Sequence, residues 1–185
     1  MVVSAVRGPG VNQMLDDEDS GRNVDAIYRR HLVLVRGRAL RILGNRALAE
    51  EVAQEAFIRF IGRRCRLGEE DNPAGMLVRI VTNLALNMLR DAKRRRELLE
   101  ESGPDPEAGR PGGLAPEELL LLRQVLARVP QREARVASYY YLDGMEHEEI
   151  AALLGTHRRA VGRTLDKFRA RATRLLANGK ERAAS

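Results

Sequence analysis

The chain has no tryptophan and only one cysteine, Cys65, so it cannot form an internal disulfide. Aromatic residues make up 4% of its 185 residues. Its three histidines, His31, His147 and His157, are scattered, and the sequence contains no HExxH, CxxC, Walker or GxGxxG motif. These absences argue against a metal site, a bound cofactor and a catalytic centre. We therefore predict that the chain is not an enzyme.

Long hydrophobic runs are also missing. No apolar stretch approaches the ~18 residues of a membrane span. The N-terminus lacks the cationic start and the apolar run of a secretory signal. We expect a cytoplasmic protein that does not insert into the membrane.

Charge, by contrast, is plentiful. The chain has 32 basic and 26 acidic residues, a net charge of +6 and a pI near 10.1, which favours a polyanionic partner. Apolar residues recur at helical spacing, and no segment alternates as a half-buried strand would. The sequence predicts an all-α protein: two small helical bundles joined by a flexible linker, the second containing a helix-turn-helix.

Residues 23–98 are predicted to form the first bundle, after a disordered arm over residues 1–22. The arm holds an acidic run and is punctuated by glycine and proline, a composition typical of disorder. Within the bundle, helical periodicity runs from Val24 to about Leu43, where Gly44 ends it. A second helix is predicted from about Ala47 to Arg64.

A third helix has the clearest pattern in the chain. It follows an acidic loop, Leu67 to Asp71, and opens at Asn72 and Pro73. An asparagine cap satisfies free amides, and proline suits the first helical position. Apolar residues then recur every four positions from Met76 to Met88. The far end is a basic cluster, which indicates either a solvated helix end or contact with a nucleic-acid backbone: Arg90, Lys93, Arg94, Arg95 and Arg96.

Residues 99–115 are predicted to be a flexible linker, because glycine and proline crowd this stretch. The second bundle follows over residues 116–178, and residues 179–185 form a tail. Its predicted helices run from Pro116 to Val129 and from about Gln131 to Leu142, and a helix-turn-helix comes next.

The most informative stretch lies between residues 147 and 166. Ala151, Gly155 and Val161 stand at the mutual spacing of a helix-turn-helix. Two steeply crossing helices leave room only for a small residue at Ala151. The turn favours a residue that accepts positive φ at Gly155, and Val161 holds the second helix on the first.

The segment after this turn is strongly basic. Between Thr156 and Arg174 there are seven basic residues and one acidic residue, Asp166. A basic second helix is typical of a recognition helix that enters the DNA major groove and neutralises phosphates on either side. The alternative is the solvated face of an ordinary helical hairpin. Spacing and charge agree independently, so we favour DNA binding.

The whole pattern resembles the minimal bacterial sigma factors of the sigma-70 family, the extracytoplasmic-function (ECF) group. The resemblance runs from about Val24 to Leu176. It depends on four segments in order, with a linker of the expected length between the two halves: IYRRH at 27–31, AEEVAQEAF at 49–57, NP at 72–73 followed by RIVTNLALNMLR at 79–90, and LDGMEHEEIAALLG at 142–155.

The resemblance implies a protein that binds core RNA polymerase and directs promoter recognition, DNA melting and transcription initiation. A dedicated anti-sigma factor is a further candidate partner. The second helix would dock on the clamp region of the polymerase, where exposed acids and an amide meet basic partners. The residues implied are Glu50, Glu51, Gln54 and Glu55.

The third helix and the acidic loop before it would open the minus-ten promoter element. Melting requires a base to leave the stack and the backbone to be held by positive charge. Amide side chains can read the edge of a flipped base, and basic side chains can hold phosphates. The candidates are Asn83, Asn87, Arg90, Lys93 and Arg94.

The helix that begins at Arg158 would read the minus-thirty-five element. Arginine suits the paired acceptors of guanine, so Arg158, Arg159 and Arg163 are expected near base edges. Lys167 and Arg169 are expected on the backbone. Thr164 lies between these positions and belongs to the same candidate set.

The chain departs from the family pattern at several positions. Ile61 and Met76 stand where tryptophan is common, Asn87 where aspartate is usual, and His157 where serine usually caps the recognition helix. The recognition-helix residues Arg159, Gly162 and Thr164 are also atypical, so promoter preference cannot be transferred from the family.

Two other functions remain open on the sequence alone. The first is a helix-turn-helix regulator that does not bind core polymerase and reads two half-sites as a dimer. The second is a degenerate relative that works through protein contacts. Charge reversal of Arg158, Arg159 and Arg163 separates the second from the others, because a protein-only role would survive it.

Overall fold

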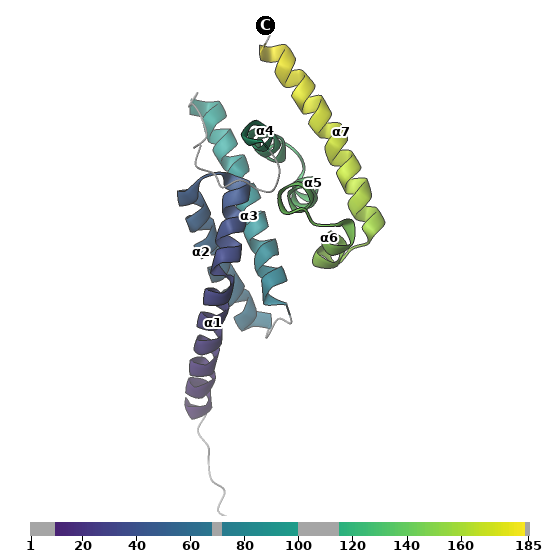
Figure 1. Cartoon of the computed structure of the whole chain (residues 1–185). Helices are drawn as coiled ribbons and strands as arrows, with labels where there is room; N and C mark the ends of the chain where they lie inside the picture. The colour runs from purple at the N-terminus through teal and green to yellow at the C-terminus, as the bar shows by residue number, and fades with distance from the viewer. Residues whose placement is uncertain (1–9, 68–71, 100–114, 184–185) are drawn as a thin grey trace, which may run out of the picture.

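The computed structural model describes residues 10–67, 72–99 and 115–183 of the chain. All regular elements in these ranges are helical (Figure 1), which confirms the all-α prediction. No helix among these residues is both long and apolar enough to cross a membrane.

Three helices form the N-terminal bundle: α1 (Gly10–Leu43), α2 (Arg46–Leu67) and α3 (Pro73–Leu99). Gly44 ends α1 with φ +69°. The predicted asparagine cap is present, because the Gly75 amide donates to Asn72 Oδ1 at 2.8 Å. The apolar stripe of α3 is buried against α1 and α2, with Leu77 and Val81 fully inaccessible to solvent.

The N-terminal end of α1 differs from the predicted arm. Residues 1–9 lie outside the described residues, but the helix is continuous from Gly10, so residues 10–22 are helical. The first part of α1 extends away from the bundle (Figure 1). Extending an existing helix costs little compared with starting one, because each added residue gains a backbone hydrogen bond. Composition alone therefore placed the start of the helix too late.

The C-terminal bundle begins with α4 (Pro116–Leu126) and α5 (Gln131–Ala137), which continues as a π-helical turn, η1 (Ser138–Leu142). Two further helices follow, α6 (His147–Leu154) and α7 (Arg158–Ala183). The predicted helix from Gln131 to Leu142 is thus present with a π-helical last turn. Helix α7 continues through most of the predicted tail.

The two bundles are docked on each other. Helices α4 and α5 lie beside α3 (Figure 1). Buried apolar side chains from both bundles, among them Ile42, Leu86, Leu126 and Phe168, belong to one continuous cluster. A separate cluster around Tyr139 forms the core of the helix-turn-helix. Most of the predicted linker lies outside the described residues.

Candidate nucleic-acid interface

The helix-turn-helix has the geometry that its spacing predicts. Ala151 is 6% exposed and Val161 is 1% exposed, so the two helices meet at these side chains. Gly155 adopts the left-handed conformation with φ +60°. The turn is closed by the Thr156 amide, which donates to the Ala151 carbonyl at 2.9 Å. These contacts confirm the predicted placement of the motif.

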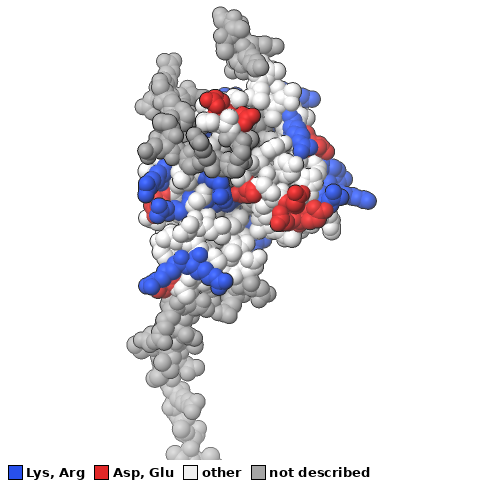
Figure 2. Space-filling model, viewed as in Figure 1, with Lys and Arg blue, Asp and Glu red and all other residues white. Residues whose placement is uncertain are grey.

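The first turns of α7 carry the predicted base-reading arginines on the surface. Arg158, Arg159 and Arg163 are exposed, as DNA contact requires. Basic side chains gather where α7 begins, next to acidic side chains over α6 (Figure 2). Arg158 pairs with Glu148 of α6 at 2.6 Å. An incoming DNA phosphate would compete with this carboxylate for Arg158.

Further along α7, the predicted backbone contacts have different surroundings. Lys167 is exposed. Arg169 Nε donates to the Tyr141 hydroxyl at 3.1 Å, and this hydrogen bond raises the pKa of Arg169. Arg171 pairs with Glu133 of α5 at 3.0 Å. The middle of α7 is therefore anchored to the preceding elements.

Thr164 does not lie where the prediction requires. Its side chain is buried, and its hydroxyl donates to the Ala160 carbonyl at 2.7 Å. Thr164 lies three residues after Val161, so both fall on the inner stripe of α7. In this conformation Thr164 cannot reach a base edge, and the helical spacing from Val161 was the signal that could have shown it.

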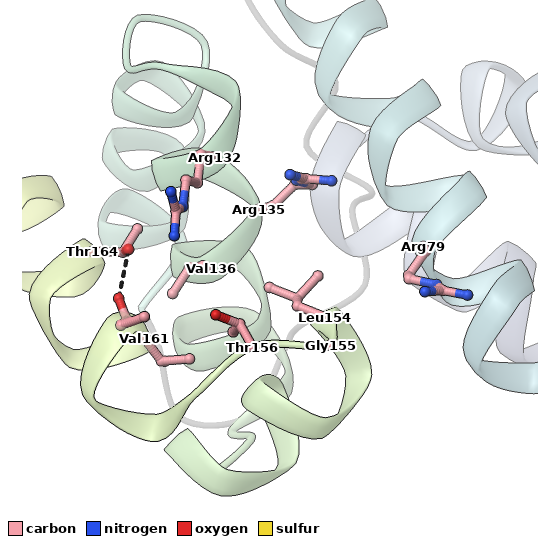
Figure 3. A pocket seen from close by; sticks show the side chains of 10 residues that line it. Arg79, Arg132, Arg135, Val136, Leu154, Gly155, Thr156, Val161 and Thr164 are labelled. Atoms are coloured by element: carbon pink, nitrogen blue, oxygen red, sulfur yellow. Dashed lines mark hydrogen bonds between the residues drawn. The ribbon is translucent and has the colours of Figure 1, made fainter.

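A pocket of about 400 Å³ lies behind the recognition helix and was not predicted. Two of its arginines come from α5 and one from α3, and Thr156 and Thr164 line the other side (Figure 3). Arg132 points toward α7, whereas Arg135 points toward α3 (Figure 3). This basic surface beside the motif suits phosphate groups. The two arginines from α5 lie one helical turn apart in the sequence, and this spacing could have indicated the pocket.

The candidate minus-ten residues on α3 are not all on an open face. Arg90 donates to the Val129 carbonyl at 3.0 Å and to the Gln131 side chain, both in the C-terminal bundle. Burial lowers the pKa of Arg90. The Asn83 Oδ1 atom is buried and has no hydrogen-bond partner among the described residues. Docking of the bundles therefore covers Arg90.

The other three candidates on α3 lie closer to solvent. Asn87 and Arg94 are exposed, and Lys93 is half-buried. Arg94 lies 4.0 Å from Asp91. Asn87 opens onto a groove of about 360 Å³ between α2 and α3, which is shared with Glu51, Glu55, Arg59 and Asp91. Carboxylates outnumber basic groups in this groove, so it suits a basic partner better than a DNA backbone.

The candidate polymerase-binding residues lie along α2. Glu51 and Gln54 are exposed. Glu50 pairs with Arg36 of α1 at 3.1 Å, and Glu55 pairs with Arg59 at 2.6 Å. Both ion pairs are solvent-accessible, so basic groups of a binding partner can replace Arg36 or Arg59 at little cost in free energy.

The docked helical bundles and the exposed basic helix of the helix-turn-helix define a DNA-binding protein. Comparison with protein families agrees. The family model described as sigma-70 region 2 matches residues 27–95, and the model described as sigma-70, region 4 matches residues 119–172.

Individual relatives point the same way. The chain is 30% identical to the RNA polymerase sigma factor CarQ of Myxococcus xanthus over 136 residues, which cover 70% of this chain and 75% of CarQ. It is 31% identical to the ECF RNA polymerase sigma factor SigE of Mycolicibacterium smegmatis, over 80% of this chain and 59% of SigE. It is 31% identical to the probable RNA polymerase sigma factor RfaY of Xanthomonas campestris pv. campestris, over 71% of this chain.

The chain belongs to the sigma-70 family of RNA polymerase sigma factors, in its ECF group. It spans 35% of the length of RfaY and 59% of SigE, so several curated relatives are considerably longer.

Proposed function

We propose that this chain acts as an ECF sigma factor in the cytoplasm: it binds core RNA polymerase, recognises promoters, melts DNA and starts transcription. One observation carries the proposal. Regions 2 and 4 of the sigma-70 family occur in order on one chain, and the second presents an exposed basic recognition helix. A helix-turn-helix regulator that ignores polymerase has no need of the first region.

In this proposal the beginning of α7 reads the minus-thirty-five element. Arg158, Arg159 and Arg163 meet base edges because they are exposed in the first two turns of α7. Lys167 and Arg169 hold the backbone. Arg132 of α5 is added to this set as a phosphate contact, because it lines the basic pocket beside α7.

The N-terminal bundle then serves the polymerase and the minus-ten element. The acidic face of α2, with Glu50, Glu51, Gln54 and Glu55, docks on the clamp region of the core enzyme. Single-stranded DNA is held by α3 through Asn83, Asn87, Arg90, Lys93 and Arg94. An anti-sigma factor that competes for either surface would regulate the chain.

Reconstituted transcription tests the proposal. The full chain is combined with bacterial core RNA polymerase and a library of genomic promoter fragments, and the transcripts are mapped. We expect initiation at a small set of promoters only when the chain is present. Failure to associate with core polymerase even at low salt would rule the proposal out. Size-exclusion mass and the symmetry of the DNA footprint then test for a dimeric regulator.

A further inference from the structure

We propose that the pocket behind the recognition helix is a binding site for a small anion that carries two linked phosphate groups. The site goes beyond the proposed function, because binding there needs neither RNA polymerase nor promoter DNA. It would give the DNA-binding bundle a small-molecule ligand.

The charged residues that line the pocket are all basic. They are Arg132 and Arg135 of α5 and Arg79 of α3, and the lining includes no aspartate or glutamate. The volume of about 400 Å³ lies in the range of small-molecule sites. Guanidinium groups present paired donors that match the oxygens of a phosphate group. The lining therefore favours a phosphorylated anion.

The two arginines on α5 have no counter-ion within the protein. Glu133, which lies between them in the sequence, pairs with Arg171 of α7 at 3.0 Å instead. Neither Arg132 nor Arg135 has an ion-pair partner among the described residues. The Arg135 Nε atom is buried and has no hydrogen-bond partner among them either. These two guanidinium groups are thus available to a ligand.

This arrangement is unfavourable while the pocket holds no anion. Like charges one helical turn apart repel each other, and repulsion is stronger where water is partly excluded. A buried donor without an acceptor is rare in folded proteins and costs free energy. An anion bound beside both arginines would remove the repulsion and supply the missing acceptor. Binding would therefore stabilise the bundle.

The directions of the two side chains indicate how many phosphate groups the ligand carries. Arg132 points toward α7, whereas Arg135 points toward α3 (Figure 3). A single phosphate group can accept a pair of hydrogen bonds from one of them, but two linked phosphate groups can reach both. Val136 and Leu154 add an apolar part to the lining, so an organic group attached to the diphosphate would have an apolar surface to cover.

The backbone of promoter DNA is the other source of phosphate groups. Arg132 is exposed and stays a proposed DNA contact. Arg135, however, points away from α7 (Figure 3). A duplex that lies on the outer face of α7 would pass beside Arg132 and leave Arg135 without a partner. A small anion is therefore the better occupant of the pocket.

Isothermal titration calorimetry of the full chain with inorganic pyrophosphate tests the proposal. Physiological ionic strength screens the general attraction of an anion to a basic protein. The pocket variants are Arg132→Gln and Arg135→Gln, each of which removes one positive charge. Arg128→Gln removes the same charge at an exposed position outside the pocket and is the matched control. Sulfate is the reference anion, because it is a single tetrahedral group.

We expect the wild type to bind one pyrophosphate per chain and to bind sulfate at least about tenfold more weakly. Each pocket variant should lose at least about tenfold in affinity for pyrophosphate, the loss expected when a hydrogen bond to a charged group is removed. The Arg128→Gln control should bind as the wild type does. Circular dichroism records folding. Because Arg132 is exposed, Arg132→Gln keeps the test decisive if Arg135→Gln fails to fold.

Three results would overturn the inference. Without saturable pyrophosphate binding, the pocket is not a site for a free anion, and weaker promoter binding by a holoenzyme containing Arg135→Gln would then assign it to the DNA backbone. An equal loss of affinity in the Arg128→Gln control would mean that overall charge attracts the anion. Equal affinity for sulfate would rule out a diphosphate site.

Failure of the proposed function is distinguishable from these results. A wild-type chain that binds pyrophosphate in the pocket but does not associate with core polymerase would contradict the proposed function and support this inference. A chain that supports transcription but binds no pyrophosphate would do the reverse.

Discussion

At the scale of the residue, the turn of the helix-turn-helix depends on one backbone conformation. Gly155 has φ +60°, and no other described atom lies within 4 Å of a Cβ built at this position. A side chain at this position would be strained by the backbone conformation but would overlap no neighbouring atom. Gly162 lies within α7 and has equally open surroundings. Because neither position is crowded, comparing the two glycines isolates the effect of the left-handed backbone conformation at Gly155.

Gly155→Ala should lower the free energy of unfolding by about 1–2 kcal/mol, because the left-handed conformation is unfavourable for alanine. Gly162→Ala should raise it by about 1 kcal/mol, because alanine is the better helix former. Urea unfolding followed by circular dichroism measures both. The same sign of change for the two variants would contradict this assignment of the turn.

Arg163 is the residue on which base reading is most sharply tested. Arg163→Ala should weaken promoter binding by about 1–3 kcal/mol if the guanidinium contacts a base, and by less if it contacts phosphate. Arg128→Ala, an exposed arginine outside α7, is the control. Fluorescence anisotropy on a mapped promoter duplex gives both affinities. If the two variants lose equally little, Arg163 does not belong to the interface.

At the scale of the element, α3 starts where a local signal placed it. The Asn72 side chain caps the helix through the Gly75 amide, and Pro73 occupies its first position. Asn72→Ala should therefore cost about 1 kcal/mol of unfolding free energy. Asn72→Asp preserves the acceptor and should cost much less. Thermal unfolding of the three proteins measures the difference, and equal losses in both variants would show that the cap contributes nothing.

Helix α7 shows which structural features the periodicity of the sequence can predict. Its basic outer face and its contact at Val161 were both predicted correctly. Thr164 was placed on the wrong side, because it was grouped with neighbouring arginines rather than aligned with the stripe of Val161, Leu165 and Phe168. On α1, periodicity alone does not separate neighbouring apolar residues: Leu34 is 41% exposed, whereas Val35 next to it is fully buried.

At the scale of the whole molecule, the net charge of +6 predicts salt-sensitive binding to duplex DNA. With about four phosphate contacts, affinity should fall roughly a hundredfold between 50 and 200 mM salt. A variant with Lys167 and Arg169, the proposed backbone contacts, both changed to alanine should show a slope shallower by about two contacts. Binding isotherms at four salt concentrations measure the slope. An affinity that does not change with salt would mean that the basic face of α7 does not contact the DNA backbone.

The sequence by itself determined the course of most helices, the cap at Asn72 and the helix-turn-helix. All of these follow from contacts within a few residues, whose spacing is written along the chain. Only the tertiary structure decided that Arg38 is buried, that Asp143 pairs with it, and that Arg90 faces α5. These partners lie tens of residues or more apart in the sequence. The residues next to an arginine in the chain do not show whether its charge will be hydrated or paired with a distant carboxylate.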